Sequence, residues 1–189
     1  ALGVSAAPDK NYLCFTANEA NSTVTLNKEG SPNAVTLKYS TDGSTWNNYT
    51  IGNDITLSSI GSKVYFRNEA SNGFTVDRSD YYQFAMTGSI AASGNVMSLV
   101  DKNCETLEIP CDYCFFRLFA RCFSLTSAQD LKLPATTLKK SCYEEMFISC
   151  IYLTEAPELL PATKLAEDCC YSMFYGCKSL TTAPKLPAT

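Results

Sequence analysis

The sequence predicts a mixed fold, in which an antiparallel β-sandwich over residues 1–88 is followed by an α/β solenoid of tandem repeats over residues 89–189. Two observations carry this prediction. In the first half, apolar and polar residues alternate with period two, which is the pattern of half-buried strands. In the second half, a motif of 26–28 residues occurs three times, and self-similarity of that period is typical of stacked repeats.

Four short segments of the first half are expected to be strands. They are rich in β-branched and aromatic residues, and turn-forming residues separate them. The segments are residues 23–26, 34–39, 54–57 and 63–67. Turns are expected at Asp42-Gly43 and at Ser71-Asn72-Gly73, because glycine accepts the positive φ that a tight reversal requires. Several short strands at this spacing favour a small antiparallel sandwich.

The region between the two halves, residues 89–109, is expected to cap the exposed core of the first repeat, as the terminal segments of repeat arrays do. Within it, Ala91-Ala92-Ser93-Gly94-Asn95 is expected to form a turn that leads into the apolar segment Val96–Val100. The chain begins without methionine and ends at Thr189, at a repeat junction. We therefore expect a fragment in which the array of repeats is cut short.

The repeat is most visible in its cysteines, because Cys122, Cys150 and Cys177 recur after 28 and then 27 residues. Around the second of them, apolar residues at spacings of three and four predict one face of a helix. These residues are Leu138, Cys142, Tyr143, Met146, Phe147 and Cys150.

A short strand is expected to follow this helix in each copy. In the second copy it carries Leu153, Ala156 and Leu159, and it is interrupted by Pro157 and ended by Pro161. Proline has no amide donor, so the strand must be short or incompletely paired. Such a unit cannot bury its apolar residues alone, and stacking on the next copy would complete the core.

The repeat resembles the BspA-like leucine-rich repeat family of bacterial cell-surface proteins. The resemblance rests on Met146-Phe147-x-x-Cys150-x-x-Leu153-Thr154 and on the corresponding residues 173–181, and it covers residues 110–189. The first copy departs from the motif, with Leu118 in place of methionine and Gln129 in place of proline. The resemblance implies a secreted or surface-anchored protein of adhesion type, often preceded by an immunoglobulin-like β module.

Ten cysteines leave three interpretations open. Cysteines at equivalent repeat positions favour buried thiols, which behave as small apolar groups. Neighbouring copies would also bring them within reach of disulfide bonds. A metal site is the third interpretation, suggested by Cys111-x-x-Cys114, but Cys169-Cys170 is not the second matching pair that zinc requires. We therefore predict no metal site and no cofactor.

Composition excludes several classes of function. The chain has no histidine, so Ser-His-Asp and Cys-His catalysis are absent. The net charge is −4, which weighs against a nucleic-acid partner. The sequence contains no run of 18 apolar residues, so no membrane-spanning helix is predicted. The acidic pairs Glu144-Glu145 and Glu167-Asp168 are expected to be solvated on helices. We expect that the protein is not an enzyme.

The predicted function is extracellular binding or adhesion, with a protein or glycan ligand held on the strand face of the repeats. A structural stalk is the alternative, and a fragment of a carbohydrate-active enzyme is a third possibility. The oligomeric state is left open. The candidate ligand-binding residues are Thr126, Ser127, Lys132, Thr154, Glu155, Glu158, Thr181, Thr182 and Lys185. Trp46, which follows the turn at Asp42-Gly43, is a secondary candidate because an exposed aromatic ring can stack on a ligand.

Overall fold

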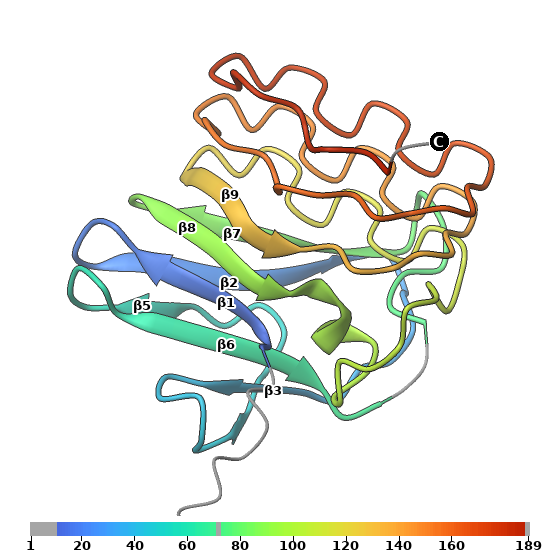
Figure 1. The fold of residues 1–189 in the computed structure, drawn as a ribbon. Coiled ribbons are helices and arrows are strands. Elements are labelled where there is room, and N and C mark those ends of the chain that lie inside the picture. Colours follow the sequence, from blue (N-terminus) through green and yellow to red (C-terminus); the bar gives the residue numbers. More distant parts are fainter. Residues whose placement is uncertain (1–10, 71–72, 188–189) are drawn as a thin grey trace, which may run out of the picture.

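The structure, a computed structural model, describes residues 11–70 and 73–187. Ser71 and Asn72 of an expected turn lie outside the described residues, as do both ends of the chain. Figure 1 shows two β-sheets, with three repeats stacked beside them. The strands are β1 (Leu13–Ala17), β2 (Ser22–Glu29), β3 (Leu37–Ser40), β4 (Asn47–Asn48), β5 (Ile55–Leu57), β6 (Lys63–Asn68), β7 (Tyr81–Thr87), β8 (Ile90–Asn95) and β9 (Leu125–Lys132).

The two sheets have the orders β4-β3-β6-β1-β8-β9 and β5-β2-β7. Each of the four expected strands overlaps an observed one. Alternation decides which side chains face inward, and in β6 the buried residues are Val64, Phe66 and Asn68. The inner faces meet through aromatic rings, since Phe84 of β7 lies 4.8 Å from Phe15 of β1 and 5.4 Å from Phe66 of β6, between ring centroids. This packing of two sheets is the arrangement of a β-sandwich.

The expected turn at Ala91–Asn95 is wrong, because these residues lie in β8, in the interior of the larger sheet. The apolar segment that follows begins as the 3₁₀ helix η1 (Val96–Leu99), which Asn95 caps by accepting a hydrogen bond from the Met97 amide. Alanine, serine and glycine dominate β8, and these residue types carry little strand preference of their own. Pairing with β1 on one side and β9 on the other therefore determines the conformation of this segment.

The prediction of an α/β repeat solenoid is wrong, because the described residues contain no α-helix. Where helices were expected, every fourth residue has a positive φ, as at Ser141, Glu145 and Ser149. Amides alternate between two kinds of partner. The Met146 amide donates to the Tyr143 carbonyl three residues back (3.2 Å), whereas the Tyr143 amide crosses to Cys169 in the next repeat (2.8 Å). The segment is a row of turns that pairs with its neighbours.

Aromatic stacking continues this pairing through the core. Phe84 of β7, Phe119, Phe147 and Phe174 form a column in which successive ring centroids are 5.7, 5.2 and 5.2 Å apart. The Phe84 amide also donates to the Leu118 carbonyl (2.8 Å), so β7 pairs directly with the first repeat. Buried residues of both halves form one apolar cluster that continues across residue 88. The division into two domains at this point stays a prediction.

The extended segments differ between copies, and proline accounts for the difference. The first copy forms β9, which pairs in parallel with β8. The corresponding segments of the later copies are joined only by isolated bridges, such as Ser127 with Glu155 and Leu159 with Lys185. Gln129 stands in β9 where the second copy has Pro157. Because proline lacks an amide donor, the later copies cannot build a continuous ladder.

Candidate binding surface

The nine residues expected on the strand face lie at the surface, where adjacent copies bring them together. Seven of them are exposed, and only Thr126 and Ser127 are half-buried. The Ser127 hydroxyl donates to the Glu155 carboxylate (2.6 Å), and the Lys185 ammonium lies 3.0 Å from the Glu158 carboxylate. The backbone stacking of equivalent positions thus builds a continuous polar column from residues that are far apart in the sequence.

The end of this column nearest β8, in the first repeat, is attached to the sheets. Thr126 Oγ1 donates to the Ile90 carbonyl (3.1 Å) and accepts a hydrogen bond from the Asn18 side chain (3.3 Å). Thr154 Oγ1 donates to the Thr126 carbonyl (2.9 Å), which links the second copy to the first. Two residues of the predicted site, Thr126 and Thr154, therefore use their hydroxyl groups to link the repeats to the sheets and to each other.

The other end of the column, towards the third repeat, borders an open depression. Glu155, Glu158, Thr181, Thr182 and Lys185 border a shallow depression of about 450 Å³. A neighbouring hollow of about 310 Å³ is lined by the other charged candidate, Lys132, and by Glu158. Both depressions are open, and the polar groups around the first of them already pair with one another.

The expected burial of Leu159 in the repeat core is wrong. Leu159 was expected to be buried with Leu153, but its side chain is 47% exposed, and Leu160 is buried instead. Leu159 borders the same hollow as Lys132. The strand face therefore carries one apolar side chain among the charged candidates.

A second surface, formed by the rows of turns, was not predicted as a site. We call it the turn face and define it by the outward side chains of residues 111–123, 139–151 and 166–178. Four aromatic side chains on or beside it are at least half exposed: Phe123 (50%), Tyr152 (59%), Tyr171 (58%) and Tyr175 (72%). A depression of about 660 Å³ is lined by Phe123, Tyr175, Arg121 and Lys178. The turn face thus combines aromatic rings with positive charge.

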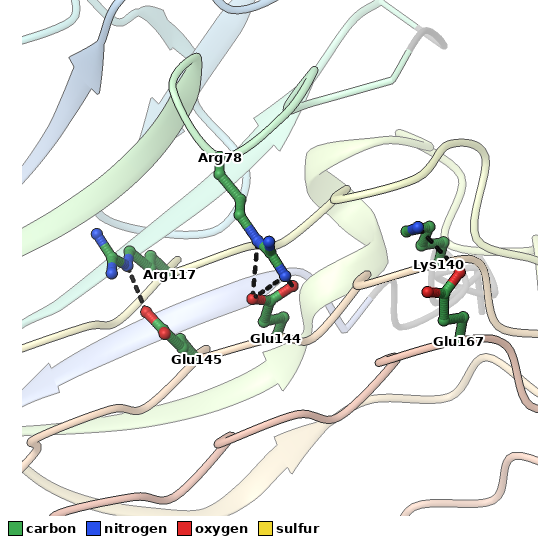
Figure 2. Close-up of polar contacts among 6 residues, drawn as sticks. All are labelled: Arg78, Arg117, Lys140, Glu144, Glu145 and Glu167. Atoms are coloured by element: carbon green, nitrogen blue, oxygen red, sulfur yellow. Dashed lines mark hydrogen bonds and ion pairs between the residues drawn. The ribbon is translucent and has the colours of Figure 1, made fainter.

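A second hollow on the turn face, of about 430 Å³, is lined by two of the three ion pairs shown in Figure 2, Arg78 with Glu144 and Arg117 with Glu145. Arg78 donates from Nε and Nη2 to the two carboxylate oxygens of Glu144, at 3.0 and 3.1 Å. These hydrogen bonds raise the pKa of Arg78, so its guanidinium stays charged. Beside this pair, Arg117 contacts the Glu145 carboxylate at 2.6 Å. Arg78 precedes β7, so its ion pair connects the sheets with the second repeat.

The expectation that Glu144 and Glu145 are solvated is wrong for Glu144, and Glu145 is also mostly buried, with its side chain 17% exposed beside Arg117. The Glu144 side chain is only 3% exposed, whereas that of its partner Arg78 is 55% exposed. A carboxylate is buried only where hydrogen bonds and an opposite charge replace water, and Arg78 supplies both. Glu167 behaves as expected, because it is exposed and pairs with Lys140 at 2.9 Å on the surface.

Trp46 lies against neighbouring side chains. Its ring is 4.2 Å from the Arg67 guanidinium and 4.9 Å from the Tyr12 ring. The turn before it is held by Asp42, whose carboxylate accepts hydrogen bonds from the amides of Ser44 (2.8 Å) and Thr45 (2.6 Å). The hydrogen bond from the Thr45 amide is the main cause that lowers the pKa of Asp42. Arg67 and Tyr12 reduce the ring area that Trp46 could offer to a ligand.

The structure confirms the interpretation of most cysteines as buried thiols. No disulfide bond joins any of them within the described residues, and six are buried. Cys122, Cys150 and Cys177 occupy equivalent positions, and each Sγ donates to a backbone carbonyl at 3.0 Å. Burial raises the pKa of Cys150 to about 12, so this thiol stays protonated at neutral pH.

Comparison of the chain with protein-family models, curated proteins and solved structures finds no match. The resemblance to BspA-like repeats therefore stays a prediction that rests on the sequence motif. Within residues 11–70 and 73–187, no helix has the length and apolar character needed to cross a membrane.

Proposed function

We propose that the protein is a non-catalytic binding protein of the cell surface, which holds a protein or glycan ligand on the outward side of its repeats. The observation that carries this proposal is the group of exposed aromatic residues on the turn face, of which Phe123 and Tyr175 line one depression with Arg121 and Lys178. Tyrosine and arginine are enriched among the residues that dominate binding energies at protein interfaces. The extracellular location rests on the resemblance to BspA-like surface proteins.

The turn face is favoured over the strand face as the principal contact surface. Exposed tyrosine rings offer large contact area with few rotatable bonds. On the strand face, Glu158 and Lys185 already pair with each other, and both side chains are at least 66% exposed. Such surface pairs contribute little energy, and a ligand would have to replace them. The strand face, with Glu155 and Glu158, is the second candidate surface.

A structural stalk is the main competing function. Such a spacer requires no exposed aromatic cluster, and isolated apolar side chains on a surface need no special explanation. Tyr171 and Tyr175 lie one turn apart on the same copy and are both exposed, which favours binding over a purely structural role. Catalysis by acidic residues is disfavoured, because arginines hold both Glu144 and Glu145.

A binding screen with two matched variants tests the proposal. The chain is immobilised and screened against extracellular-matrix proteins and a glycan array. One variant carries Tyr171→Ser and Tyr175→Ser, and the other carries Glu155→Lys and Glu158→Lys. All four residues are exposed, so both variants should fold like the parent.

We expect a specific ligand whose binding is lost in the tyrosine variant and retained in the glutamate variant. The reverse result would place the site on the strand face. A ligand unaffected by both variants would contradict a site on the repeats and direct attention to Trp46. Absence of any ligand for the folded parent would favour the stalk.

A further inference from the structure

The first repeat contains a pair of cysteines that the later repeats lack. Cys111 and Cys114 are three residues apart, and the second and third copies have Lys139 and Ala166 at the position of Cys111. Cys114 is fully buried, whereas Cys111 is half-buried. Tyr113 between them has φ 55°, so the chain turns there. The side-chain hydrogen bond between them shifts the pKa values of Cys111 and Cys114 in opposite directions, lowering that of Cys111 and raising that of Cys114.

Cys111 is also packed against the segment that precedes β7. Its Sγ donates to the Thr75 carbonyl (3.6 Å), and a Cβ added to Gly73 would lie 2.6 Å from this sulfur. The hydrogen bond from Cys114 lowers the pKa of Cys111, whereas burial raises that of Cys114. One partly accessible thiol with increased thiolate character thus stands beside a buried, protonated one. This asymmetry is typical of dithiol pairs that exchange with disulfides.

We propose that Cys111 and Cys114 are a redox-active pair, which small-molecule disulfides convert into an intramolecular disulfide bond. Residues three apart across a turn have Cα atoms within about 7 Å of each other, and a disulfide requires roughly 4.4–6.8 Å. The other half-buried thiols differ from this arrangement, since none of Cys104, Cys170 and Cys177 has a cysteine three residues away. The inference is independent of the proposed binding function.

The reaction proceeds in two balanced exchange steps. Cys111 first loses its proton, and its thiolate attacks one sulfur of the small disulfide. This forms a mixed disulfide at Cys111 and releases one thiolate, which takes up the proton. Cys114 then loses its proton and attacks the Cys111 sulfur, which forms the Cys111–Cys114 bond and releases a second thiol. Two protein thiols are oxidised, and one disulfide is reduced to two thiols.

Oxidation has a structural consequence at the segment that precedes β7. The Cys111–Cys114 disulfide has no S–H group, so the hydrogen bond from Cys111 to the Thr75 carbonyl is lost. The same segment leads to Arg78, which pairs with the buried Glu144. The redox state of the pair is therefore coupled to the contact between the sheets and the second repeat.

Controlled oxidation of the folded chain of 189 residues tests this inference. The reduced protein carrying Cys104→Ser is incubated with increasing oxidised glutathione, and the remaining thiols are then alkylated. An Asp-specific protease cleaves before Asp112 and separates Cys111 from Cys114. Mass spectrometry then detects joined peptides only where a disulfide links the two sides of this cleavage.

We expect the joined peptides to appear before any other cysteine is modified. Adding Cys114→Ser should abolish them completely and leave one glutathione adduct at Cys111, whereas adding Cys111→Ser should abolish both products. Joined peptides that persist without Cys114 would overturn the assignment. The chain that retains Cys104 gives the glutathione concentration at which this ordinary thiol is modified. If the Cys104→Ser protein forms no joined peptides at that concentration, the assignment is also overturned.

Discussion

The aromatic column makes a sharp prediction about how the sheets and the repeats depend on each other. Phe119 is fully buried and stacks between Phe84 of β7 and Phe147 of the second repeat, at 5.7 and 5.2 Å. Truncating a buried phenylalanine to alanine costs about 3–5 kcal/mol, and each aromatic pair contributes roughly 0.5–1.5 kcal/mol beyond its buried area. Since Phe119→Ala removes two stacked pairs, we expect a loss of about 5 kcal/mol in the free energy of unfolding.

Denaturant unfolding followed by two signals measures this loss and locates it. Trp46 is the only tryptophan and lies in the first half of the chain, so its fluorescence reports on the sheets. Far-UV circular dichroism reports on the whole backbone. Because Phe119 belongs to a core that both halves share, we expect Phe119→Ala to lower the midpoint of both signals together.

Phe123→Ala is the matched control, because this ring is 50% exposed and its loss should change stability by less than about 0.5 kcal/mol. Phe119→Leu retains most of the buried volume and should cost clearly less than alanine. An unchanged Trp46 midpoint in Phe119→Ala, with a reduced circular-dichroism midpoint, would refute the argument. The two halves would then unfold as separate domains.

Three further predictions concern charges and thiols. Arg78→Ala should lower the thermal midpoint more than Lys140→Ala does, because it leaves the buried Glu144 carboxylate without its partner; equal shifts would argue against this. Because the folded-state pKa of Asp42 is lowered, its ionisation stabilises the protein above pH ~4, and this contribution is lost as the pH falls towards the folded-state pKa. The stability difference between the parent and Asp42→Asn should therefore shrink during acid titration, and a constant difference would count against the Asp42 hydrogen bonds. The buried thiols other than Cys114, such as Cys150 with its pKa of about 12, should react with a chromogenic disulfide at pH 8 only after unfolding, and rapid reaction of all ten would contradict their burial.

Several features could be predicted from the sequence because they depend on local patterns. Alternation of apolar and polar residues located β2, β3, β5 and β6, since the side chains of a strand point to opposite faces in turn. The repeat length and the burial of the cysteine columns were equally visible, because equivalent positions in stacked copies have equivalent surroundings. The column that includes Glu155 was correctly expected at the surface.

The helices were predicted wrongly because the spacing of apolar residues did not distinguish two conformations. Residues four apart, such as Cys142 and Met146, share one face of a helix, and they also share one side of a row of turns with a positive φ at every fourth residue. The choice depends on where the amides find acceptors. Alternate amides donate to carbonyls of the neighbouring copy, as from Tyr143 to Cys169. The local sequence of one copy cannot predict these acceptors, because they belong to another copy.

The turn face and the buried ion pair were missed for the same reason. With a helix assumed, Glu144 and Glu145 were expected to point into solvent, and Tyr171 and Tyr175 were not considered as a surface group. The partner of Glu144 is Arg78, 66 residues earlier in the chain. Local patterns thus determined the strands, the repeat period and the apolar columns. Only the tertiary structure decided the backbone of the repeats and their charged contacts, because hydrogen-bond acceptors and counter-charges distant in sequence come from neighbouring layers of the fold.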